Sequence, residues 1–183
     1  QELTIGDLQV KPVPIETKTL HCVSQYIADE DKARDIKDIL VLTLRVKNLS
    51  SDTTFYPNDP AFNRALSRND KEIIPYTNLQ LGKDHYGGVF DWPPTEKIKR
   101  EFIKQHQADE QPLEPGDERD PYVTVSHKHD IQGKIKSRPD TEILLWRVQL
   151  RRGLVKCKNE EGQEREISAT CVIGVEFKKD QVR

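Results

Sequence analysis

The segment Asp38–Asn48, with the sequence DILVLTLRVKN, limits the fold of this chain more than any other stretch. Large apolar residues stand at the even positions from 40 to 46, and polar residues stand at the odd positions from 43 to 47. Successive side chains of a β-strand point to opposite faces of its sheet, so this alternation predicts a strand with one buried and one solvated face. The Asn, Ser and Asp residues at 48–52 favour a turn after it. The segment therefore predicts a sheet and leaves the chemistry open.

A second strong strand is predicted over Thr141–Arg152, where every even position from 144 to 150 is apolar. We expect Leu42 of the first strand and Trp146 of the second to lie in one core. The chain then predicts a hairpin of Leu154–Lys158 and Ile167–Phe177, which turns at 159–162. One face of its second strand carries Cys171, Ile173, Val175 and Phe177.

Weaker patterns indicate the other strands. Leu3–Val10 alternates and is then interrupted by Pro12 and Pro14, which favours an edge strand because proline is tolerated at sheet edges. Thr19–Ile27 is a less regular strand candidate. Tyr122–His127 follows a Pro-Gly turn and is predicted to be a strand with its valines inward.

The predicted connections are long. Ala28–Lys37 is almost entirely charged, which favours an exposed connection, and His129–Asp140 is expected to be a loop. The region 51–94 is dense in Pro, Asn, Asp and Gly and is predicted to hold loops and short strands. In Thr95–Gln107 a short amphipathic helix is favoured over a strand, because two prolines precede it and apolar residues recur four apart.

These elements define the predicted architecture. A chain of 183 residues is long enough for one domain with its own core, so 1–183 is taken as a single domain. With 34% hydrophobic and 33% charged residues, a thin two-layer core is favoured over a thick helical one. The expected fold is mainly all-β: an antiparallel β-sandwich of about seven to nine strands, with a long irregular insertion and one short helix.

Several short motifs resemble those of a known group of domains. They are the strand VLTLRVKNLS, the pair Phe55-Tyr56, the turn LEPG at 113–116 and the final VIGVEF. In this order they are similar to the telokin-like, immunoglobulin-like domains of bacterial exported proteins and lipoproteins. The resemblance covers Leu3–Phe177 and implies an immunoglobulin-like sandwich. It further implies a non-enzymatic accessory or adhesion-type module.

Charge and hydropathy narrow the choice of partners. The net charge is −2 with both signs interspersed, which argues against nucleic acid, because nucleic-acid-binding domains often have a pI above about 9. No apolar run approaches the roughly 18 residues of a membrane-spanning helix, so no membrane insertion by this segment is expected. Methionine is absent even at position 1, which favours a processed, extracytoplasmic protein, periplasmic or at the cell surface, with an anchor in a missing N-terminal segment as one reading. A domain excised from a larger cytosolic protein is the alternative. The oligomeric state is left open.

Metal and disulfide signals are weak. His127 and His129 are two apart and project to one side of a strand, but no spacing supplies further ligands, so no metal and no cofactor are expected. The acidic run at 29–31 lacks the glycine and glutamate of a calcium loop and is expected to be solvated.

The three cysteines are expected to be small buried hydrophobes. A bridge from Cys157 to Cys171 is disfavoured, because the hairpin puts the two sulfurs out of register.

No motif points to catalysis. The sequence contains neither a G-x-S-x-G elbow nor a phosphate-binding glycine loop. The chain is therefore expected not to be an enzyme, with an unrecognised catalytic site as an alternative. The main hypothesis is a non-enzymatic interaction or accessory module of an exported or membrane-anchored protein.

The candidate binding residues lie between 76 and 92. Aromatic and amide side chains gather there among glycines and prolines, and such residues on loops suit carbohydrate or peptide recognition. The named binding candidates are Tyr76, Asn78, Tyr86 and Trp92. Tyr86 and Trp92 are expected to be the most exposed rings of a loop running from Asn78 to Trp92. The alternative is that these rings cover the ends of the sheets.

Overall fold

The computed structural model describes residues 1–22, 34–57, 76–91, 112–125 and 130–183. These residues form two antiparallel sheets, which confirms the expected all-β, two-layer architecture. Only short helices, α2 (Ile131–Lys136) and the 3₁₀ helix η2 (Lys179–Gln181), accompany the strands in this part of the chain. The strands are β1 (Leu3–Ile5), β2 (Leu8–Cys22), β3 (Arg34–Asn48), β4 (Asn78–Leu81), β5 (Asp84–Asp91), β6 (Glu118–Arg119), β7 (Tyr122–Val125), β8 (Leu144–Lys158) and β9 (Glu164–Phe177).

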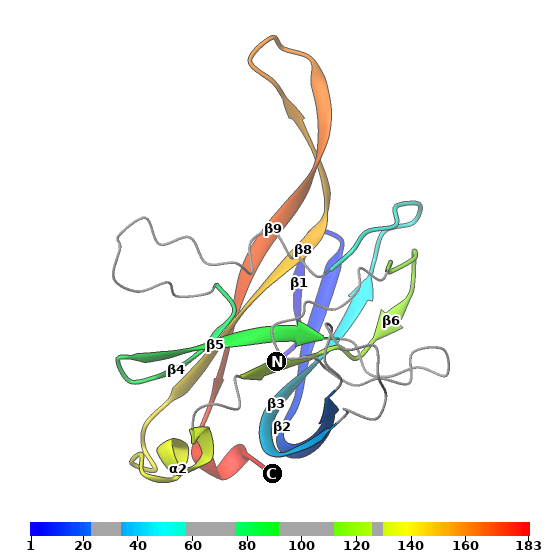
Figure 1. Cartoon of the computed structure of the whole chain (residues 1–183). Coiled ribbons are helices and arrows are strands. Elements are labelled where there is room, and N and C mark those ends of the chain that lie inside the picture. Colours follow the sequence, from blue (N-terminus) through cyan, green and yellow to red (C-terminus); the bar gives the residue numbers. More distant parts are fainter. Residues whose placement is uncertain (23–33, 58–75, 92–111, 126–129) are drawn as a thin grey trace.

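Strand β5 belongs to both sheets (Figure 1). Its first half, residues 84–87, pairs with β4, and its second half, residues 88–91, pairs with β7. The first sheet has the order β1-β2-β3-β7-β5, with β6 also on β3, and the second has the order β5-β4-β8-β9. A strand that passes from one sheet to the other forms a corner of a sandwich. The change of partner occurs at Gly87-Gly88, where the backbone carries no side chain to oppose a bend.

The core lies between the two sheets. The even positions of β3 from 40 to 46 and those of β8 from 144 to 150 are all at most 1% exposed. Leu42 and Trp146 are both fully buried in this one cluster, as the alternation predicts. A second, smaller cluster lies on the other face of β3, where Val41 and Ile39 pack with Leu20 and Tyr122. The N-terminal half of β3, around residues 39–41, is therefore buried on both faces, which the alternation does not predict.

Strand β2 corrects the prediction that Pro12 and Pro14 interrupt the first strand. It runs without a break through both prolines, and its register against β3 shifts between Pro12 and Ile15. This irregularity lets the strand accommodate residues that cannot donate a ladder hydrogen bond. On its other edge β2 pairs with β1 only at residues 8–10, so the prolines lie at a sheet edge, as expected.

Other boundaries also differ from those predicted. The expected loop His129–Asp140 contains helix α2, which starts where the Asp130 carboxylate accepts a hydrogen bond from Gly133 N at 2.9 Å. Strand β3 already begins at Arg34, inside the predicted connection. The predicted helix Thr95–Gln107 lies outside the described residues. Among the described residues, no helix has the length and apolar character that crossing a membrane requires.

The C-terminal residues return to the first sheet. Val182 forms a parallel bridge with Ile15, and Arg183 N donates to Ile15 O at 2.9 Å. Thr17 N in turn donates to Arg183 O at 2.7 Å. The chain after β9 therefore occupies an edge of β2 and ties the second sheet to the first.

Candidate functional site

The segment predicted as an aromatic binding loop is mostly a β-hairpin. Strands β4 and β5 pair from Asn78 with Gly87 to Leu81 with Asp84. Tyr86 stands opposite Leu79 on the core face and is only 8% exposed, so the prediction that its ring is exposed is wrong. Directly opposed residues share a face of the sheet, and Leu79 is fully buried. The ring of Tyr86 instead lies 5.5 Å from the Lys134 ammonium of α2.

Asn78 is also buried, with 1% of its surface exposed. Its amide oxygen lies 3.3 Å from His85 Nδ1, and its amide nitrogen donates to Tyr76 O at 3.4 Å. These contacts hold the hairpin together. Tyr76 is 43% exposed, and Trp92 lies outside the described residues. The structure therefore does not bring Tyr76, Asn78 and Tyr86 together on one accessible surface.

The weak metal candidates are not described, because His127 and His129 lie outside the described residues, as does the acidic run at 29–31. In the part of the chain that the structure describes, no group of three or more His, Cys, Asp or Glu side chains could hold a metal ion.

Cys157 and Cys171 are both free thiols. They stand opposite Arg165 and Leu150 respectively, which agrees with the expected mismatch in register. Burial raises the pKa of the Cys171 thiol, against the opposing effect of Arg152.

The best-defined ion pair joins β3 to the residue after β6. Arg45 Nε and Nη2 donate to the two carboxylate oxygens of Asp120, each at 2.8 Å. This bidentate pair lowers the pKa of Asp120 and raises that of Arg45. Both side chains are about two-fifths exposed and neither borders the core. The arrangement secures a strand connection and does not resemble an acid–base pair in a cleft.

The most distinctive feature of the surface is the far end of the β8–β9 hairpin, residues Leu154–Ser168, which we call the arm. It rises beyond the other elements, with its turn at the end of the molecule opposite α2 and the C-terminus (Figure 1). Its base is a β-bulge between Arg151 and Leu154, where Gly153 adopts a φ of +105°. The β1–β2 turn packs against this bulge, since Asp7 N donates to Arg152 O at 3.2 Å.

The two faces of the arm differ in character. On one face Lys156 stands opposite Glu166, and Lys158 stands opposite Glu164. The other face carries what we call the apolar stripe, which is Val155, Cys157 and Ile167 in the arm and Ala169 just below it. Arg165 lies on this face too, opposite Cys157. By the alternation of β9 this is the same face on which Cys171 and Ile173 point to the core. The core face of the hairpin therefore continues past the end of the core.

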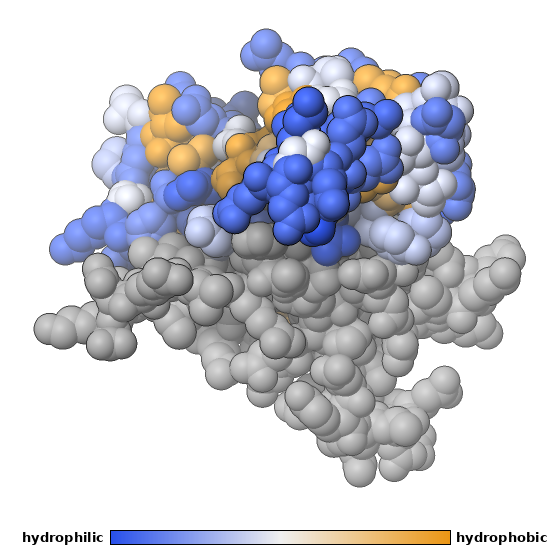
Figure 2. All heavy atoms as spheres, turned by 90° about the horizontal axis from the view of Figure 1, so that it is seen from above, coloured by the Kyte–Doolittle hydropathy of each residue, from blue (hydrophilic) through white to orange (hydrophobic). Residues whose placement is uncertain are grey.

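The apolar stripe is accessible among the described residues. Ile167 is 48% exposed, and the other three members of the stripe are half-buried. Figure 2, which looks down on the end of the molecule that carries the arm, shows hydrophobic atoms beside a strongly hydrophilic projection. No site was predicted here from the sequence, although the alternation of Ile167–Phe177 contains its signal. What the alternation does not show is where the core ends.

Comparison of the chain with protein-family models, with curated proteins and with solved structures gives no match.

Proposed function

We propose that this chain is a non-enzymatic interaction module that binds a protein partner through the apolar stripe of the arm. One observation carries the proposal. The face of the β8–β9 hairpin that is buried in the core around Ile173 stays apolar where the hairpin extends beyond the core, and there it is exposed. Full burial of a side chain such as Ile167 stabilises a structure by about 1.5–3 kcal/mol. A partner that covers the stripe would gain energy of this kind.

The surroundings of the stripe suit a protein surface. Arg165 stands opposite Cys157 on the same face, so a charged residue borders the apolar centre, as in protein interfaces generally. Strand β9 is the last strand of its sheet, and in the arm it pairs only with β8 among the described residues. Its outer edge can accept an extended segment of the partner by β-strand addition. An isolated two-stranded hairpin is only marginally stable in water, so docking would also rigidify the arm.

The other predictions have less support. A carbohydrate or peptide site on residues 76–92 would have to use Tyr76 and the undescribed Trp92, since Asn78 and Tyr86 are buried. The immunoglobulin-like identity is supported by the two-sheet architecture only in general terms. The extracytoplasmic location and the non-enzymatic character stay predictions from the sequence.

Site-specific photocrosslinking tests the proposal. A benzoylphenylalanine is placed at position 167, on the stripe, or at position 168, on the opposite face of the same strand, in cells that make the protein. We expect a crosslink to one partner protein from position 167 and none from position 168. The purified partner should then bind an Ile167→Lys variant at least tenfold more weakly than wild type, and bind Ser168→Lys unchanged. A crosslink from position 167 only to its own chain, or equal capture from both positions, would overturn the proposal.

A further inference from the structure

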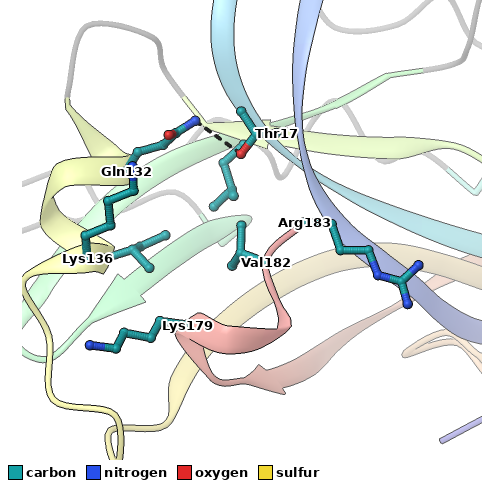
Figure 3. Close-up of a pocket in the computed structure, with 8 residues that line it drawn as sticks. Thr17, Gln132, Lys136, Lys179, Val182 and Arg183 are labelled. Carbon is teal, nitrogen blue, oxygen red and sulfur yellow. Dashed lines mark hydrogen bonds between the residues drawn. The ribbon is translucent and has the colours of Figure 1, made fainter.

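A cavity of about 450 Å³ lies at the other end of the molecule from the arm, between β2, β3, α2 and the C-terminal residues (Figure 3). Its volume falls within the range of small-molecule sites, roughly 300–1,000 Å³. The residues that matter for its chemistry are Thr17, Leu40, Gln132, Ile135, Lys136 and Val182.

The walls of the cavity are mainly aliphatic. Leu40 of β3 and Ile135 of α2 belong to the main core and are 1% and 4% exposed. Val182, from the segment after η2, packs against the same core. Three elements far apart in the sequence thus supply the apolar lining of the cavity, with Leu40 and Ile135 at its floor against the core. A ligand body that lies here is an alkyl chain or a similar apolar group.

The polar wall is held in a fixed orientation. Gln132 Nε2 donates to Thr17 Oγ1 at 3.1 Å and to Asp38 O at 3.2 Å, which uses both hydrogens of the amide. Asp38 has a φ of +60°, the one positive φ among the described residues other than glycine. Such strain persists only where surrounding contacts impose it, and the hydrogen bond from Gln132 is one such contact. Because Thr17 Oγ1 accepts from Gln132, its hydroxyl hydrogen is left to donate to a ligand.

The charged side chains of the lining are positive. Lys136, Lys179 and Arg183 line the cavity, and no acidic side chain of the described lining opposes them. The Lys179 ammonium is already engaged, 2.5 Å from Asp140 Oδ1 and 2.8 Å from Arg138 O. Arg183 extends away from the cavity across β2 (Figure 3). Lys136, whose side chain runs beside Gln132 in the same view, is thus the cation that faces a ligand.

We propose that this cavity binds a small amphipathic carboxylate, with its alkyl chain against Leu40, Ile135 and Val182 and its carboxylate at Lys136 and Thr17. The aliphatic wall selects an apolar body, and the cation with a nearby hydroxyl donor selects an anionic acceptor. The site is independent of the arm, so its failure would leave the proposed function untouched.

Methyl NMR of the intact chain tests the site, with octanoate as the probe. Titration should shift the methyl signals of Ile135 and Val182 saturably, while octan-1-ol and acetate, which lack the charge or the chain, bind more weakly. Lys136→Gln should weaken octanoate binding about threefold to fivefold, the range expected for one partly exposed charge contact. Lys134→Gln is the matched control: it removes a charge two residues away on α2 that does not line the cavity, and the affinity should not change.

Three results would overturn the proposal. They are the absence of saturable shifts at Ile135 and Val182, an equal affinity for octanoate and octan-1-ol, and equal losses in the Lys136→Gln and Lys134→Gln variants. Each would show that the cavity does not recognise the combination of chain and carboxylate.

Discussion

The carboxylate of Asp7 lies directly against the backbone of Gly153: a Cβ added to Gly153 would come within 2.8 Å of Asp7 Oδ2. This contact joins the β1–β2 turn to the bulge at the base of the arm. Position 153 therefore requires a residue without a side chain. The φ of +105° at Gly153 is a second reason, because residues with a Cβ rarely adopt it.

We therefore predict that Gly153→Ala lowers the free energy of unfolding by about 1–3 kcal/mol. Gly162→Ala is the control, because Gly162 also has a positive φ, +79°, but has nothing within 4 Å of an added Cβ. The Gly162 variant should be the less destabilised of the two by denaturant melts, and removing the carboxylate in Asp7→Ala/Gly153→Ala should recover part of the loss. Equal costs at the two glycines would show that the contact with Asp7 is unimportant.

The burial of Leu42 gives a second prediction. Leu42→Ala should cost about 2–5 kcal/mol of stability, because it removes a fully buried side chain from the centre of the core. Thr43→Ala, one residue along and on the partly exposed face, should cost less than about 1 kcal/mol. An unchanged thermal midpoint for Leu42→Ala would remove β3 from the core.

The Arg45–Asp120 pair predicts a pH dependence. The pKa of Asp120 is lowered below its ordinary value of 3.8 in the folded state, chiefly by its hydrogen bonds with Arg45. The carboxylate therefore contributes stability that is present above pH 3.8 and is lost as the pH falls through the lowered pKa. The effect is small, because both side chains are exposed.

The stability difference between wild type and Asp120→Asn should accordingly be constant near neutral pH and shrink below about pH 4. A carboxyl-carbon NMR titration should place the midpoint of Asp120 below its ordinary value. A normal midpoint, or a stability difference that persists to low pH, would contradict the pairing.

The two free thiols of the hairpin should differ in reactivity. Burial raises the pKa of Cys171, so less of it is thiolate at pH 8 and its alkylation by iodoacetamide should be slow. Peptide-resolved mass spectrometry should show Cys157, on the arm, modified faster. Recovery of a Cys157–Cys171 disulfide-linked peptide would contradict the register of β8 against β9.

Period-two alternation was sufficient to predict β3, the two halves of β8 and β9 as strands, because a half-buried strand must alternate whatever its neighbours are. It also placed Leu42 and Trp146 in one core. It wrongly divided β8 into Thr141–Arg152 and Leu154–Lys158, which the structure joins across a bulge. The turn LEPG could be predicted from its residues, and Asp117 N does donate to Glu114 O at 2.9 Å. These features depend on local sequence alone.

The rest depends on tertiary context. The bulge that carries β2 past Pro12 exists only because β3 pairs on both sides of it. Helix α2 has six residues with a glycine inside, too few for a helical period to stand out. Tyr86 faces the core because of the register of β4 against β5, which the sequence of β5 alone does not contain. The arm is the part of the β8–β9 hairpin that extends past the neighbouring strands, and the lengths of those strands cannot be read from the hairpin's own sequence. Its exposed stripe could therefore not be distinguished from core residues.

The most direct test of the proposed interaction surface compares Ile167 with Ile173, which share a face of β9 but are 48% and 5% exposed. If the stripe is a free surface, Ile167→Lys should change the free energy of unfolding by no more than about 0.5 kcal/mol, as surface substitutions do. Ile173→Lys, which buries a charge in the core, should cost several times more. Equal and large losses in the two variants by urea denaturation would show that the chain covers its own stripe, and would contradict the account.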